Sequence, residues 1–330
     1  MIPTSNSKAA ILKYTAIALA VVLLISVAFF ALSMWEKQRG NFPETPKLDQ
    51  TLEYNGRKYE QKKGIETFLV LGLDKYQNYV SSESYNNDKQ ADFLMLFVFD
   101  TEEKKYSAIH INRDTMTDVA RLGVAGERIS TSVEQIALAH THGNGREVSC
   151  RNVADSVSEL LCGVKVTHYL SITMDAVPLY NDILGGVEVE VLEDFTGIDD
   201  TLVRGERVTL MGEHALNYVR TRYGLDDSTN STRMQRQQQY LNALREKTEM
   251  MMEQDGEFIV TASLEMSEHI VSDRSVTQLQ ELARKMSEYE FTQIYSIEGD
   301  NVEGEKFIEF YPDPDSLKKT VIDLFYNPKD

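Results

Sequence analysis

A group of arginines stands close together in an otherwise acidic chain. The segment YVRTRYGLDDSTNSTRMQRQQQ, residues 218–239, contains Arg220, Arg222, Arg233 and Arg236. Arginine forks make bidentate contacts with phosphate oxygens, so the group indicates a site for a pyrophosphate. Surface ion pairs with the many acidic side chains are the alternative, because exposed pairs are common and contribute little.

The second half of this segment predicts a helix that faces the anion. Asn230 or Ser231 can cap a helix that begins near Thr232. Arg233 and Gln237 are four residues apart, so they project from one face of its first turns. Free N–H groups and the dipole at a helix N-terminus also favour anions, which strengthens the prediction of a phosphate site.

A second motif, Asn112-Arg113-Asp114-Thr115, follows a predicted strand at 106–111. Ends of strands are where open α/β sheets present ligand-binding groups, so Arg113 and Asp114 are candidate site residues. A structural salt bridge at the strand end is an equal alternative.

Two aspartates lie at the ends of two neighbouring predicted strands. Asp74 follows the apolar run at 67–73, and Asp92 begins the run at 92–99. In an antiparallel pair the end of one strand lies beside the start of the next, so the two carboxylates can converge. With phosphate oxygens and water they would satisfy octahedral Mg²⁺. Aspartates that cap turns are the alternative.

The elements that must position these residues alternate along the chain. Apolar runs predict strands and three- or four-residue spacing predicts helices. Such alternation argues for a layered α/β domain. The expected strands are 67–73, 92–99, 106–111, 166–172 and 187–191, the expected helices are 132–139, 152–161 and 174–184, and the tail from 257 to 330 is expected to form strand, helix, strand, strand and helix.

The N-terminal region predicts a membrane anchor. Residues 11–35 are apolar apart from Lys13, and about 20 such residues suffice to cross a bilayer as a helix. A cleaved signal peptide is the alternative, but its apolar run is usually shorter. We expect a cytoplasmic N-terminus at 1–10, a single-pass anchor at 11–35, a polar spacer at 36–64 and an extracytoplasmic catalytic domain at 65–330.

Composition excludes several other classes. The 330 residues carry a net charge of -18, which argues against general nucleic-acid binding. His140 and His142 lack a third ligand at zinc-like spacing, so a metal site there is not expected. Cys150 and Cys162 lie on or beside a predicted helix, too far apart for a disulfide, so we expect two unpaired thiols.

These signals together resemble the LytR-CpsA-Psr family of cell-envelope phosphotransferases over residues 66–250. The order of the motifs and a preceding membrane anchor are both similar to the family. The matching stretches are GLDK at 72–75, ADFLMLFVFD at 91–100, INRDT at 111–115, HYLSITMDAVPLYNDILGGVEVEV at 168–191, and GEHALNYVRTR continuing to RMQRQQQ.

The resemblance implies a central mixed sheet flanked by helices and a magnesium-dependent transferase. Such an enzyme moves a glycopolymer from a polyprenyl-pyrophosphate carrier to peptidoglycan through a phosphodiester, with the polyprenyl chain in an apolar tunnel. It implies that Asp74 and Asp92 hold Mg²⁺. By the same resemblance the catalytic residues are Arg113, Arg220, Arg222, Arg233 and Gln237, and further substrate contacts come from Lys75, Asp114, Arg236 and Gln238.

The chain departs from the family pattern at several positions. Lys75 is followed by Tyr76 and Gln77, where the family commonly has an arginine, and lysine keeps the charge but loses the fork. Asn230 stands where the family often has an aspartate, so a general base has moved to Asp226 or Asp227 or is absent. A non-catalytic module that binds polyprenyl phosphates, or a hydrolase of the lipid pyrophosphate, is therefore the rival function.

Overall fold

The computed structural model describes residues 51–74, 90–221, 225, 230–255, 258, 262, 265–275, 278, 288–305 and 307–329. The predicted anchor at 11–35, Lys75, Arg222 and the two candidate bases Asp226 and Asp227 lie outside these residues. The chain divides into two compact units, which are described separately. Among the described residues, unit 1 comprises those of Thr173–Ile270 and Arg274–Phe291, and unit 2 comprises those before Thr173, Val271–Asp273 and those from Thr292 onward.

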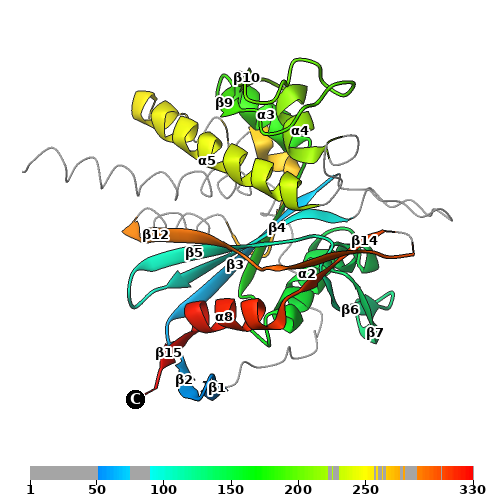
Figure 1. The fold of residues 1–330 in the computed structure, drawn as a ribbon, viewed down its shortest axis with the longest axis vertical. Helices are drawn as coiled ribbons and strands as arrows, with labels where there is room; N and C mark the ends of the chain where they lie inside the picture. The colour runs from blue at the N-terminus through cyan, green and yellow to red at the C-terminus, as the bar shows by residue number, and fades with distance from the viewer. Residues whose placement is uncertain are drawn as a thin grey trace, which may run out of the picture. The chain divides into compact units, whose positions relative to one another are not determined.

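A six-stranded sheet forms the centre of unit 2 (Figure 1), in the order β11-β8-β3-β4-β5-β12. The pairs β3–β4 and β4–β5 are antiparallel, which confirms the predicted central hairpin. The α/β class with a central sheet and flanking helices is confirmed as well. The strands are β3 (Ile65–Leu73), β4 (Ala91–Asp100), β5 (Lys105–Ile111), β8 (His168–Thr173), β11 (Ile270–Ser272) and β12 (Glu290–Ser296).

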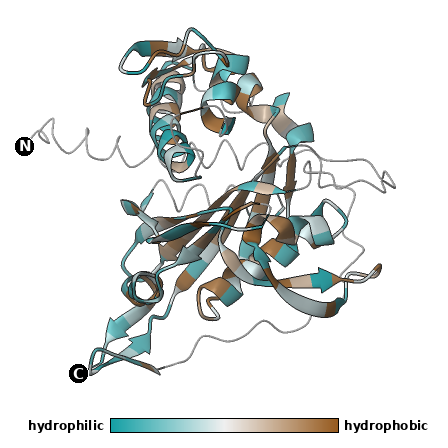
Figure 2. Cartoon of the chain, turned by 45° about the vertical axis from the view of Figure 1, so that its right-hand side comes forward, coloured by the Kyte–Doolittle hydropathy of each residue, from teal (hydrophilic) through white to brown (hydrophobic). Residues whose placement is uncertain are grey.

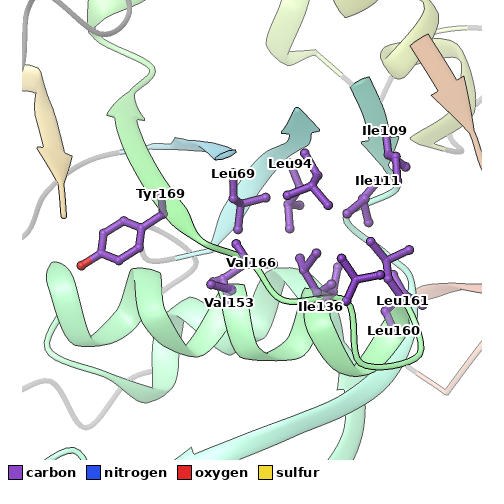
Figure 3. Packing of buried hydrophobic residues seen from close by; sticks show 14 of the residues in the cluster. Leu69, Leu94, Ile109, Ile111, Ile136, Val153, Leu160, Leu161, Val166 and Tyr169 are labelled. Atoms are coloured by element: carbon purple, nitrogen blue, oxygen red, sulfur yellow. The ribbon is translucent and has the colours of Figure 1, made fainter. Parts of the chain in front are cut away.

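The central strands of the sheet are apolar (Figure 2). Strands β3, β4 and β5 are buried over nearly their whole length. One face packs against α2 (Glu147–Leu160) and α8 (Pro314–Phe325). Figure 3 shows Leu69, Leu94 and Ile111 of the strands above Val153 and Leu160 of α2. Strands covered on both faces lose the polar alternation of surface strands, which is why continuous apolar runs predicted them.

The prediction of a helix at 132–139 was wrong for residues 132–135, whereas residues 136–139 are helical. A hairpin of β6 (Met116–Leu122) and β7 (Arg128–Gln135) occupies the first part, and a 3-10 helix, η4 (Ile136–His142), follows. Only Ile136, Ala137 and Ala139 of the predicted helix are buried apolar residues, whereas Val133 is exposed on β7. The β-branched residues of RISTSV favour a strand, and that preference outweighed the apparent helical spacing.

The second half of the predicted spacer at 36–64 is folded, which corrects that prediction. Strands β1 (Thr51–Tyr54) and β2 (Arg57–Gln61) form a hairpin, and β2 pairs with β15 (Tyr326–Pro328). The hairpin is polar because it is largely exposed, so composition alone resembled a linker. The tail also contains the antiparallel pair β13 (Gly299–Glu303) and β14 (Ile308–Pro312), and α8, whose first turn is capped by the Asp313 side chain.

Unit 1 contains the helices that carry the arginine group. Its described elements include α3 (Ala176–Ile183), α4 (Glu213–Arg220) and α5 (Asn230–Gln254), together with the antiparallel pair β9 (Val187–Glu190) and β10 (Arg207–Leu210). Helix α3 is followed by Gly185 and Gly186, which both have positive φ, a conformation that glycine adopts without strain. The predicted helix near Thr232 is confirmed as α5, and it begins at Asn230.

Two further expectations concern cysteines and the membrane. Cys150 and Cys162 are unpaired, as predicted; Cys150 is buried and Cys162 is exposed. Within the ranges that the structure describes, no helix combines the length and the apolar character needed to cross a bilayer.

Candidate functional site

The first group of candidate residues, here called the strand-end group, consists of Asp74, Gln90, Asp92, Arg113 and Asp114 in unit 2. All five side chains are at least nine-tenths buried. They come from the end of β3, the start of β4 and the turn after β5. The sheet register therefore brings together charged residues that are far apart in the sequence.

A β-bulge sets the position of Asp92. Leu73 pairs with Ala91, but Gly72 pairs with Phe93, so Asp92 has no partner of its own on β3. Asp74 directly follows Leu73. The two aspartates therefore lie at the same end of the β3–β4 pair, as predicted from strand order. A bulge releases its extra residue from the regular ladder and redirects side chains, a use common near functional sites.

Arg113 contacts three other members of the strand-end group. Its Nη1 donates to Asp92 Oδ1 and its Nη2 donates to Gln90 Oε1. Its Nε lies 3.6 Å from Asp114 Oδ1. The guanidinium is thus fixed in orientation by two strands, as a residue that must meet a phosphate in one geometry requires.

The backbone around Arg113 is held by a tight turn. Asn112 Oδ1 accepts from the backbone N–H of Asp114 at 3.0 Å, and Asn112 O accepts from the Thr115 hydroxyl at 2.6 Å. An asparagine that bonds the backbone two residues on is a standard turn former, so Asn112 stabilises the turn that carries Arg113. Asp114 is fully buried and accepts from Gln135 Nε2 at 3.1 Å. These contacts favour a positioning role for Asp114.

The donor set fits Mg²⁺ in its chemistry. Asp74 and Asp92 supply carboxylate oxygens at one sheet edge, and Mg²⁺ is commonly held by one or two carboxylates plus phosphates and water. No cluster of three or more His, Cys, Asp or Glu side chains occurs among the described residues. A metal there would need oxygens from the substrate, which is the arrangement expected for a phosphate-bound ion.

The second group, here called the α4–α5 group, lies in unit 1 and consists of Glu193, Arg220, Arg233, Arg236 and Gln237. Arg220 is the last residue of α4 and is exposed. Arg233, Arg236 and Gln237 lie in the first two turns of α5, and each is at most 4% exposed. Gln238 is half-buried on the same helix. The three members on α5 are thus built into the unit, whereas Arg220 presents its side chain at the surface.

Arg236 is the most completely enclosed cation of the group, with 1% exposure. Its Nη1 donates to the carbonyl of Tyr218 and its Nη2 donates to the carbonyl of Thr221. Its Nε lies 2.7 Å from Glu193 Oε2, and its guanidinium stands over the rings of Phe195 and Tyr218. The partners of this guanidinium come from the end of α4 and from the segment after β9, so its orientation is set within unit 1.

Sequence reasoning identified the arginines and aspartates but did not single out three of their partners. Gln90 accepts from Arg113, Gln135 donates to Asp114, and Glu193 pairs with Arg236. Each partner is separated from the residue it contacts by more than 20 positions, and none carries a motif of its own. Only the pairing of strands and the packing of loops could reveal them.

Comparison with known proteins agrees with this architecture. The model of the LytR_cpsA_psr family matches residues 33–319. A Bacillus cereus relative, the polyisoprenyl-teichoic acid–peptidoglycan teichoic acid transferase TagU, is 22% identical over 302 residues, 90% of this chain and 91% of its own length.

Two solved structures show the same fold. Bacillus subtilis TagV superposes with a TM-score of 0.57 at 23% identity, covering 79% of this chain and 97% of its own. TagT bound to LI-WTA gives a TM-score of 0.56 at 19% identity, covering 79% and 90% of the two chains. With a family model that spans most of the sequence, the chain belongs to the LytR-CpsA-Psr family.

Proposed function

We propose that this chain is a cell-wall glycopolymer transferase that takes its polymer from a polyprenyl-pyrophosphate carrier and joins it to peptidoglycan. The observation that carries the proposal is the buried Arg113, oriented by Asp92 and Gln90, in a chain of this family. Relatives named teichoic acid transferases and a relative bound to LI-WTA support the class of substrate.

The chemistry requires little beyond positioning and charge. In the proposed reaction the acceptor hydroxyl oxygen forms a new bond to the phosphorus that carries the polymer. The bridging P–O bond of the pyrophosphate breaks, polyprenyl phosphate leaves, and the hydroxyl proton passes to solvent or to a carboxylate such as Asp226 or Asp227. Cationic side chains accelerate such a transfer because they neutralise charge that develops on the phosphate oxygens.

Each group of residues has a role in this proposal. Arg113 orients and neutralises a phosphate, with Asp114 and Gln135 fixing the turn from which it projects. Arg220, Arg222 and Arg233 supply further positive charge. When Mg²⁺ is bound by Asp74 and Asp92, it would withdraw electron density from the phosphate oxygens.

The face of the sheet that leads to Asp74 and Asp92 is apolar. Phe93 contacts the ring of His110 with centroids 5.0 Å apart, and His110 pairs with Met95. Phe68 and Phe97 continue that face, opposite the core packed on α2. Buried apolar side chains beside charged groups would match a carrier with a polyprenyl tail and a pyrophosphate head, which supports a lipid-linked donor. We place the catalytic domain outside the cytoplasmic membrane, anchored by residues 11–35.

A transfer assay tests the function. Purified protein is mixed with a polyprenyl-pyrophosphate-linked glycopolymer and peptidoglycan fragments, with Mg²⁺ present, and both polyprenyl phosphate and polymer-linked peptidoglycan are measured. The proposal predicts that the two products form together. Release of polyprenyl phosphate without acceptor would instead identify a hydrolase, and tight binding without either product would identify a binding module; both results contradict the proposal.

A further inference from the structure

We propose, on the basis of that function, that Arg236 is a positioning residue that acts through Arg220. The geometry is a helix cap supplied from another helix: side chains of α5 bond the carbonyls at the C-terminal end of α4. Arg220 is the last residue of α4, so its backbone lies between two of the bonded carbonyls.

The end of α4 needs such partners. The last four carbonyls of an α-helix have no N–H donor within the helix, so other groups must donate to them. Here Arg236 donates to the carbonyls of Tyr218 and Thr221, and Gln237 Nε2 donates to the carbonyl of Val219 at 3.1 Å. Asn217 O accepts from the backbone of Thr221 at 3.1 Å. The carbonyls that flank Arg220 on both sides are therefore tied to the first turns of α5.

Arg236 itself is held from behind by a loop between β9 and β10. Glu193, 5% exposed, pairs with its Nε at 2.7 Å. Phe195, fully buried in the same loop, stacks on Tyr218 with ring centroids 5.7 Å apart, and both rings underlie the guanidinium. Tyr218 also donates its hydroxyl to Gln239 Oε1. A cation enclosed by an acid, two rings and two carbonyls keeps one orientation.

Enclosure favours a positioning role for Arg236, which is less exposed than Arg113 at 8%. Its Nε and both terminal nitrogens each face a protein acceptor, and the side chain is only 1% exposed. Among the described residues at this helix end, Arg220 is exposed and can reach a ligand, and Arg236 fixes the backbone from which its side chain projects.

Two conservative variants test the role. Arg236→Lys keeps the charge but loses the planar fork that bonds two carbonyls, and Glu193→Gln keeps the size but removes the anion that orients it. Arg207→Lys is the matched control, because Arg207 pairs with Glu188 at the surface of the same unit. Transfer kcat and KM are measured for each, together with the unfolding midpoint.

We expect Arg236→Lys and Glu193→Gln to lower kcat by on the order of 10- to 100-fold, since small displacements of a positioning group have effects of that size. In an Arg220→Ala background, Arg236→Lys should cause no additional loss, because the residue acts through Arg220. The Arg207→Lys control should match the wild type in kcat and unfolding midpoint.

Two results would overturn the inference. Additive losses of Arg236→Lys and Arg220→Ala would show that Arg236 acts on the substrate by itself. Normal turnover in Glu193→Gln and Arg236→Lys, with an active wild type, would show that the cap has no role. A wild type without transfer activity would instead refute the proposed function, so the two failures are distinguishable. The midpoints separate lost folding from lost positioning.

Discussion

At the scale of single residues, the buried contact between Arg113 and Asp92 determines which substitutions can separate lost catalysis from lost stability. The two side chains are 9% and 10% exposed, so the pair is largely removed from water. Removing one partner of a buried pair typically costs about 3–5 kcal/mol, because the other charge stays buried without compensation. Arg113→Ala would therefore confuse lost stability with lost catalysis, and a charge-conserving change is the better probe.

Arg113→Lys should lower transfer turnover by on the order of 100-fold while the protein stays folded, since lysine cannot bond Asp92 and Gln90 with one planar fork. Turnover and circular dichroism at the working temperature measure the two effects. Arg121→Lys, at an exposed arginine of β6 that pairs with Glu134, is the control. Equal turnover in Arg113→Lys and the control would contradict the role given to Arg113.

The metal proposal makes a separate prediction at Asp74. Asp74→Asn should raise the Mg²⁺ concentration needed for half-maximal turnover by about tenfold or more, because an amide oxygen is a weaker ligand than a carboxylate. A chelator should abolish wild-type turnover, and added Mg²⁺ should restore it. Asp118→Asn, at an exposed aspartate of β6, serves as the control. Turnover that is indifferent to chelator would contradict metal assistance.

The candidate site could be predicted only in part at this scale. Arginine and aspartate are chemically unusual at strand ends and helix starts, so Arg113, Asp92 and Arg233 stood out. Their roles depend on burial and partners, which spacing does not reveal. Arg236 and Arg233 look alike in the sequence, yet Arg236 is tied to backbone carbonyls and Glu193.

At the scale of elements, helix α2 carries Asp155, whose burial disfavours the ionised carboxylate. Burial raises the pKa of Asp155 from 3.8 to about 6, although the nearby Arg151 and Arg128 lower it, and Glu159 adds to the rise. The folded state therefore holds the proton more tightly than the unfolded chain. Ionisation of Asp155 costs stability above the folded pKa, and the cost disappears below the unfolded pKa.

Asp155→Asn should accordingly stabilise the protein at pH 7.5 by about 1–3 kcal/mol, the equivalent of up to roughly two pKa units. The gain should shrink as the pH falls from 6 towards 4 and vanish below that range. Denaturant unfolding followed at several pH values measures it. A stabilisation that does not change between pH 7.5 and pH 4 would show that the effect is not ionisation of Asp155.

The same scale shows which elements sequence patterns can identify. Strands β3, β4 and β5 were predictable because both of their faces are buried, so hydrophobicity alone marks them. The hairpin of β6 and β7 was missed because its exposed residues leave no apolar run. Strands β1 and β2 are also largely exposed, so composition alone predicts a spacer there. The pairing of β2 with β15 joins distant parts of the chain.

At the scale of the whole molecule, the net charge of the protein has the same sign as the charge of the expected substrate. The net charge is -18, yet the proposed substrate carries a pyrophosphate. Binding must then come from local cations, such as Arg113 in unit 2 and the arginines of α4 and α5 in unit 1. Arg113 in unit 2 and Arg220 in unit 1 are each proposed to be needed for transfer.

The most direct test of that claim is single-turnover transfer from a lipid-pyrophosphate donor, measured for the wild type, Arg113→Lys, Arg220→Ala and the exposed control Arg121→Lys. We expect the wild type and the control to form polymer-linked peptidoglycan together with polyprenyl phosphate, whereas both site variants should lose at least about 100-fold in rate. Wild-type rates in either site variant, with the fold intact, would contradict it.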